Sequence, residues 1–73
     1  MQDNLIRMAN QIATFFDSMP DRQEALLGWA THIRKFWEPR MRQQFLAKLD
    51  AGQVQDLHAL VLQAVQQHRA LIE

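Results

Sequence analysis

Apolar residues recur at steps of three and four along nearly the whole chain, which is the spacing of one face of an α-helix. Leu5, Met8 and Ile12 form the first such stripe, and a pair of phenylalanines continues it. Three more stripes follow, each separated from the one before by a turn signal. This pattern predicts four helices, over about residues 3–17, 20–37, 39–50 and 54–72.

The breaks between the stripes contain residues that start or stop helices. Ser18 and Asp21 have the spacing of a capping box, and Pro20 between them is tolerated in a first helical turn. Pro39 disfavours the α conformation in the residue before it and also suits a helix start. Gly52 can adopt the left-handed conformation that ends a helix. The helical spacing throughout predicts an all-α fold. Because the connections are short, we expect a small antiparallel helical bundle of four helices, or of three if the second and third merge at a kink at Pro39.

Gly28 falls inside a predicted helix, where glycine costs about 1 kcal/mol relative to alanine. The simplest explanation is that another helix packs closely against this position.

The length of 73 residues allows one domain, residues 1–73, with a thin core. The chain has no cysteine, which removes disulfides and thiolate-held metal clusters and is typical of a reducing compartment. Eight basic residues balance eight acidic ones, which argues against a general nucleic-acid binder. No stretch approaches the roughly 20 apolar residues of a membrane span, and the first residues do not look like a secretory signal. We therefore expect a cytoplasmic protein that binds neither nucleic acid nor a membrane.

Residues that could carry chemistry do not form a catalytic or metal-binding motif. His32, His58 and His68 lack the three- or four-residue helical spacing of a metal site. The acidic residues between 17 and 24 cluster at a helix junction, where they suit capping and the helix dipole. We expect no catalytic residue, no metal site and no cofactor in this chain, and hence no enzymatic activity of its own.

The densest group of basic and aromatic residues lies between residues 32 and 42 and reads HIRKFWEPRMR. Trp, Met and Arg are enriched in protein interfaces. A protein interface fits this pattern as well as a simpler arrangement, in which the aromatic rings are core and the basic side chains are a solvated rim. Nucleic-acid binding fits less well, because the net charge is zero. His32 is either a boundary residue that packs its ring or a hydrogen-bonding residue for a partner.

Large apolar residues are adjacent at several places in the sequence, among them Phe15–Phe16, Leu26–Leu27 and Phe36–Trp37. Adjacent residues lie about 100° apart around a helix, so both members of each pair are hard to bury in one small bundle. We infer that some of these side chains face a partner or a second copy of the chain.

Two blocks of sequence carry a resemblance to a known family. The first reads LIRMANQI, from Leu5 to Ile12, and is followed by Phe-Phe and Met-Pro pairs that end at Pro20. The second is the block at residues 32–42. In order and spacing these blocks resemble the delta subunit of soluble NAD-dependent formate dehydrogenases, the bacterial enzymes that contain molybdenum or tungsten. The resemblance covers the first two-thirds of the chain, and the stretch after Gly52 has no sharp motif.

The resemblance implies an accessory role. In this family the alpha subunit holds the molybdopterin centre and iron–sulfur clusters, beta holds flavin and the NAD site, gamma holds a further cluster, and delta carries no cofactor. The expected function is a non-catalytic subunit that stabilises or helps to assemble the complex that oxidises formate to carbon dioxide. Its expected partners are the formate dehydrogenase catalytic subunits, alpha first, and self-association is also open. The alternatives are a transient maturation chaperone for the alpha subunit and an unrelated, self-associating helical regulator.

Eight residues are candidates for the partner interface: Asn10, Gln11, Phe16, His32, Trp37, Arg40, Met41 and Arg42. Asn10 and Gln11 are polar at positions that the apolar spacing does not explain. Trp37 and Met41 are the expected anchors. The arginines at 40 and 42 can pair with a partner's carboxylates or with the phosphates of a bound cofactor.

Overall fold

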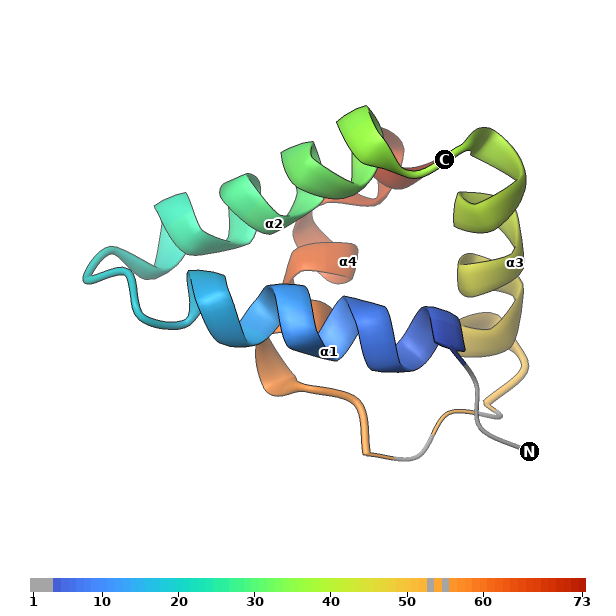
Figure 1. Ribbon diagram of the computed structural model, residues 1–73, viewed down its shortest axis with the longest axis horizontal. Coiled ribbons are helices and arrows are strands. Elements are labelled where there is room, and N and C mark those ends of the chain that lie inside the picture. Colours follow the sequence, from blue (N-terminus) through green and yellow to red (C-terminus); the bar gives the residue numbers. More distant parts are fainter. Residues whose placement is uncertain (1–3, 53, 55) are drawn as a thin grey trace.

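The structure is a computed structural model that describes residues 4–52, 54 and 56–73. These residues form four α-helices and no strand (Figure 1): α1 Asn4–Phe16, α2 Arg22–Phe36, α3 Pro39–Asp50 and α4 Ala59–Ile72. The all-α prediction is therefore confirmed, with four helices rather than three. Asp3, the first residue of the first predicted helix, lies outside the described residues.

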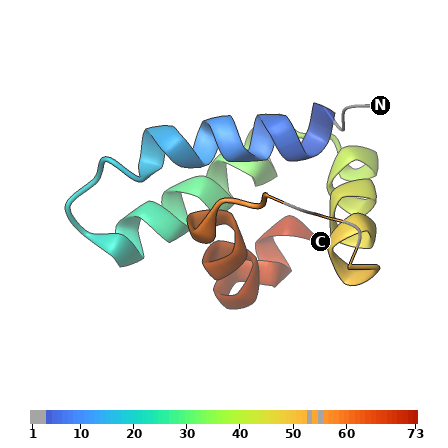
Figure 2. The same ribbon diagram turned by 90° about the horizontal axis from the view of Figure 1, so that it is seen from below.

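Helices α1 and α2 form an antiparallel pair, and α4 packs most extensively on α2. Helix α3 lies across one end of that pair instead of running along it, and the view from below shows the same arrangement (Figure 2). The antiparallel arrangement expected for the bundle thus describes α1 and α2. Because α3 runs crosswise, it covers the end where α2 finishes.

Trp29 of α2 occupies the centre of the core and is fully buried. Its indole N–H donates a hydrogen bond to the carbonyl of Ala9 in α1, at 3.1 Å. Its ring centroid lies 6.1 Å from that of Phe45 in α3. One side chain therefore links three helices. The fourth helix adds its buried apolar residues to the same core: Leu60, Val61, Ala64, Val65 and Ile72.

Helix α2 begins after Asp21, which is its N-cap. The carboxylate accepts hydrogen bonds from the backbone N–H groups of Gln23 and Glu24, at 2.9 and 3.3 Å. The predicted capping box is wrong, because the Ser18 hydroxyl donates instead to the carbonyl of Phe15 at the end of α1. Asp21 alone supplies the acceptor that the first turn of α2 needs.

Two extended residues separate α2 from α3. Trp37 has φ −92° and ψ 135°, and Glu38 has φ −65° and ψ 153°. Pro39 then opens α3, where its missing N–H costs nothing. At the far end of α3, Gly52 has φ +69°, which confirms the left-handed conformation predicted for it.

Helix α4 begins at Ala59, five residues later than the apolar spacing predicted. Asp56 has φ +56°, a left-handed conformation that a helix cannot contain. His58 is the N-cap, and its Nδ1 accepts a hydrogen bond from the N–H of Leu60 at 3.1 Å. The helix is also kinked near its end, where His68 has non-helical dihedral angles.

Candidate protein-interaction surface

Four aromatic rings contact one another in series on the surface of the α1–α2 pair. The centroids of Phe15 and Phe16 are 5.1 Å apart, those of Phe16 and His32 are 6.2 Å apart, and those of His32 and Phe36 are 4.7 Å apart. We call this set the aromatic strip. It joins the last turn of α1 to the last turn of α2.

The strip depends on Gly28. A Cβ placed on this residue would stand only 2.7 Å from Cε1 of Phe16 and 2.9 Å from its Cδ1. The Phe16 ring therefore lies directly on the α2 backbone, which confirms the expectation that another helix packs closely against Gly28. This contact holds Phe16 half-buried between the two helices.

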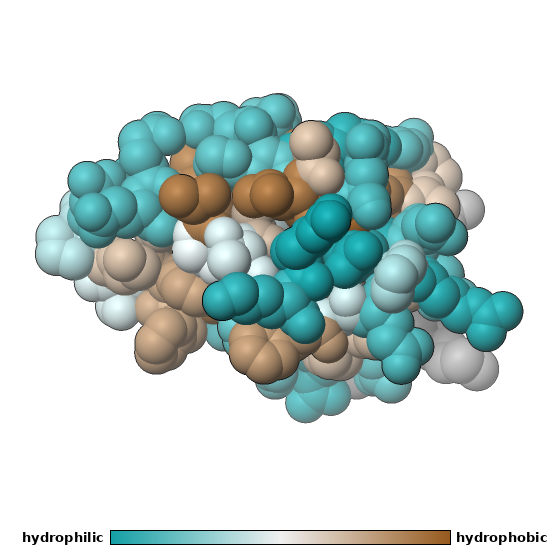
Figure 3. Space-filling view, turned by 90° about the horizontal axis from the view of Figure 1, so that it is seen from above, coloured by the Kyte–Doolittle hydropathy of each residue, from teal (hydrophilic) through white to brown (hydrophobic). Residues whose placement is uncertain are grey.

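The two ends of the strip are open to solvent. Phe15 is 71% exposed and Phe36 is 70% exposed, whereas Phe16 and His32 are half-buried between them. Hydrophobic side chains also interrupt the hydrophilic surface along the lower edge of Figure 3. Aromatic side chains are enriched in protein interfaces, so the exposed rings at the two ends favour an interaction surface.

The imidazole of His32 contributes polar groups to this apolar strip. The ring packs against Phe16 and Phe36, and none of the described residues forms a hydrogen bond with it. One ring nitrogen of a neutral histidine is a donor and the other an acceptor. Both remain available to solvent or to a partner at a half-buried position.

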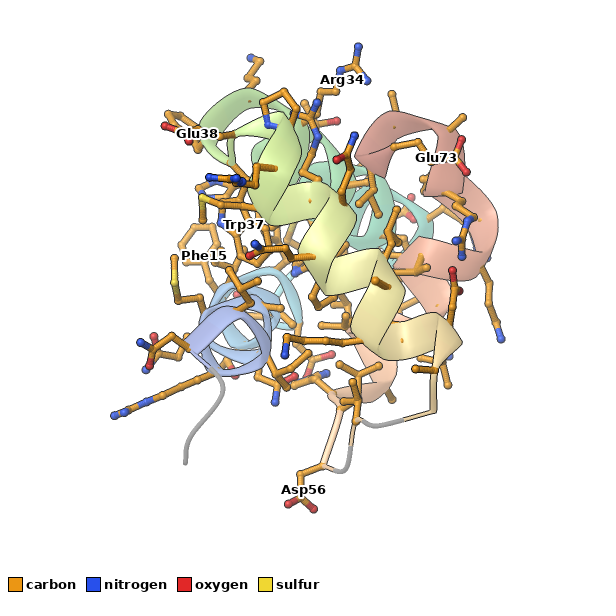
Figure 4. The ribbon with its side chains drawn as sticks, turned by 90° about the vertical axis from the view of Figure 1, so that its right-hand side faces the viewer. Phe15, Arg34, Trp37, Glu38, Asp56 and Glu73 are labelled. Atoms are coloured by element: carbon orange, nitrogen blue, oxygen red, sulfur yellow. The ribbon has the colours of Figure 1, made fainter. Side chains whose placement is uncertain are left out.

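The charged residues that lie near Phe36 in the sequence are mostly basic. Lys35 and Arg40 are exposed, and Glu38 is the exposed carboxylate between them. Arg34 belongs to another face, since its Nη1 donates to the carbonyl of Leu71 in α4 at 3.4 Å. In Figure 4 it lies at the top, away from Phe15.

Trp37 and Arg42, two of the predicted interface residues, are buried within the chain, at 4% and 8% exposed. The Trp37 ring packs edge-on against Phe45, with centroids 5.6 Å apart. Nη1 of Arg42 donates to the carbonyls of Arg34 and Trp37, at 2.9 and 3.0 Å. Arg42 thus satisfies carbonyls at the end of α2 and ties α3 to it. These internal contacts give both residues a structural role, and a partner contact through them stays a prediction.

Asn10 also has internal partners. Its Nδ2 donates to the carbonyl of Asp56 at 2.9 Å, and its Oδ1 accepts from the N–H of His58 at 2.9 Å. The amide therefore fastens the segment before α4 to α1, which explains a polar residue at this position. The neighbouring Gln11 is exposed, Arg40 is exposed, and Met41 is half-buried against the core.

Among the predicted candidates, then, Phe16 and His32 are brought together in the strip, and Arg40 is exposed close to it in sequence. Phe15 and Phe36, its most exposed members, were not among the candidates. The signal for them was their place in adjacent aromatic pairs. One member of each pair packs inward, and the helix geometry turns the other outward.

The described polar side chains do not gather into a metal centre: no group of three or more His, Asp or Glu residues lies close enough there to hold an ion. Asp50 and Arg69 form a carboxylate–guanidinium pair joined by two hydrogen bonds of 3.1 and 2.7 Å. The hydrogen bonds from Arg69 are the main cause that holds the pKa of Asp50 below its ordinary value. Desolvation of the carboxylate opposes them, and the charge of Arg69 adds a smaller lowering. In the described part of the chain, no helix combines the length and hydropathy needed to cross a membrane.

Four short helices around one core, with an aromatic strip on the surface, define a small all-α domain. The family model for the NADH-dependent formate dehydrogenase delta subunit, FdsD, matches residues 4–65. The match includes α1, α2, α3 and the first half of α4, so the chain belongs to this family. No curated protein and no solved structure shows significant similarity to the chain.

Proposed function

We propose that this chain is a non-catalytic accessory subunit of a cytoplasmic NAD-dependent formate dehydrogenase, which it stabilises or helps to assemble. The observation that carries the proposal is the match of residues 4–65 to the delta-subunit family. The exposed ends of the aromatic strip support it, because a subunit of a larger complex must present apolar surface to its neighbours.

The roles of the polar side chains support a non-catalytic chain. Asn10 fastens the segment before α4, Asp21 and His58 cap helices, and Arg42 closes the end of α2. These groups are engaged in holding the fold together. A catalytic acid or base needs instead to reach a bound substrate.

The proposed partners are the catalytic subunits of the enzyme, the alpha subunit first. The test is to express the tagged chain together with the other subunits, isolate it, and measure both subunit stoichiometry and NAD-dependent formate oxidation. We expect active enzyme that contains this chain in a fixed ratio. A parallel preparation that lacks the chain should lose activity faster on warming.

Two other outcomes would contradict this role. Recovery of the chain only with cofactor-free alpha subunit would identify a transient maturation chaperone. Recovery of the chain alone, with enzyme of unchanged stability in its absence, would return the problem to a self-associating helical domain.

A further inference from the structure

The aromatic strip is built on the buried core of the domain. Phe16 is fixed on the backbone of Gly28, and its ring contacts both Phe15 and His32. Both helices that carry the strip contribute buried residues to the same core. Exposed aromatic side chains on such a scaffold lose little conformational entropy on binding, which is why aromatic residues are common binding hot spots.

The exposed charged residues near the two ends of the strip indicate which charges a complementary partner surface would carry. Next to Phe36 in the sequence, Lys35 and Arg40 are exposed, and Glu38 is the exposed carboxylate between them. At the Phe15 end, Asp17 is already paired with Arg22, at 2.6 Å. The charges that remain for a partner are therefore mainly positive, and a complementary surface must supply carboxylates.

A second copy of the chain does not meet this need. Two copies that paired through the strip would bring Lys35 of one copy either to the mainly basic set of Lys35, Glu38 and Arg40 in the other copy or to its Phe15 end. There the carboxylate of Asp17 is already engaged by Arg22. A different protein surface, with an apolar groove and acidic residues on its rim, is the better complement.

We propose that the aromatic strip is the surface through which this chain docks on another subunit of the formate dehydrogenase, in an apolar groove flanked by carboxylates. Phe15 and Phe36 enter the groove, His32 forms a hydrogen bond between them, and Lys35 and Arg40 pair with the rim. This inference rests on the proposed function, since it locates the contact that an accessory subunit requires.

The first experiment removes the two exposed rings from the full-length chain and measures its retention in the complex. The test variant is Phe15→Ser with Phe36→Ser. The matched control is Leu27→Ser with Leu62→Ser, which also removes two exposed apolar side chains, 47% and 49% exposed, from other positions on the surface. We expect the test variant to weaken association about 30-fold or more, the factor that corresponds to about 2 kcal/mol. The control should stay within about threefold of the wild type.

The second experiment tests the charge of the partner. Lys35→Glu and Arg40→Glu should each weaken association, and the loss should be larger at low ionic strength than at high. Arg34→Glu makes the same charge change on the face toward α4 and serves as the control. Equal effects of all three substitutions would contradict the proposal that carboxylates flank the partner's groove.

The outcomes separate this inference from the proposed function. If the wild-type chain is not retained in the enzyme, the proposed function fails. If the wild-type chain and the folded Phe15→Ser/Phe36→Ser variant are retained equally, the strip is not the docking surface, and the accessory role stands. If that variant instead turns a dimer of the isolated chain into a monomer and leaves retention unchanged, the strip joins two copies and the inference is wrong.

Discussion

The ring of Phe16 lies on the backbone of Gly28 so closely that a Cβ at residue 28 would stand 2.7 Å from it. Two opposed effects therefore act on Gly28→Ala. Alanine gains about 1 kcal/mol of helix propensity, but overpacking a close contact typically costs about 1–3 kcal/mol. We expect a net loss of about 1 kcal/mol in the free energy of unfolding, measured by urea titration.

The same substitution should change sign once the ring is gone. In a Phe16→Ala background, Gly28→Ala should raise the free energy of unfolding by up to about 1 kcal/mol, because only the propensity gain remains. The same loss in both backgrounds would show that the Phe16 contact is not what selects glycine at this position.

Asn10 should matter for stability far more than its neighbour Gln11. Replacing Asn10 by alanine leaves the carbonyl of Asp56 and the N–H of His58 without their partner, at an expected cost of about 1–2 kcal/mol. Gln11→Ala changes an exposed side chain and should stay within about 0.5 kcal/mol. Asn10→Asp separates the contributions of the two hydrogen bonds, because it keeps the acceptor for the N–H of His58 and removes the donor to the carbonyl of Asp56. Equal midpoints in urea for the two alanine variants would contradict this account.

The sequence predicts the first three helices well because their signals are local. Apolar steps of three and four define each stripe, and Pro39 and Gly52 act through their own backbone preferences. The start of α4 is different. Leu57 continues the apolar spacing, yet Asp56 is left-handed and its carbonyl is bound by Asn10, 46 residues earlier. No local pattern contains that contact.

The candidate site was predictable only in part, for a similar reason. Adjacent aromatic pairs show that one ring of each pair must be exposed, but the helix period does not say which. The choice between Phe36 and Trp37 depends on the two extended residues after α2, which turn α3 across its end. That turn buries Trp37 against Phe45 and brings Arg42 to the carbonyls of α2.

The Asp50–Arg69 pair predicts how stability responds to acid. Hydrogen bonds from Arg69 lower the pKa of Asp50 in the folded chain, so the folded state holds the charged carboxylate more strongly than the unfolded state does. Its stabilisation is complete above the ordinary carboxyl pKa of about 4, and it is lost as the pH falls through the lower folded value. The difference in urea midpoint between wild type and Asp50→Asn should therefore shrink from pH 6 toward pH 2. A constant difference over that range would mean that the pair contributes no pH-dependent stability. The side chains of Arg69 and Asp50 are 41% and 57% exposed, so the effect should also weaken at high salt.

The two neighbouring aromatic residues at the end of α2 should differ strongly in how much stability the domain loses when each is truncated to alanine. Trp37 is 4% exposed and packs on Phe45, so Trp37→Ala should cost about 3–5 kcal/mol. A core in a chain of this length rarely supplies more than about 3–5 kcal/mol in total, so the variant should be largely unfolded by circular dichroism. Phe36 is 70% exposed, and Phe36→Ala should change the free energy of unfolding by less than about 1 kcal/mol.

Loss of the complex in Trp37→Ala therefore reports unfolding, whereas loss in the folded Phe36→Ala variant reports the docking surface. A folded Trp37→Ala variant with a wild-type urea midpoint would show that Trp37 does not hold α3 against α2, and it would restore this residue as an interface anchor.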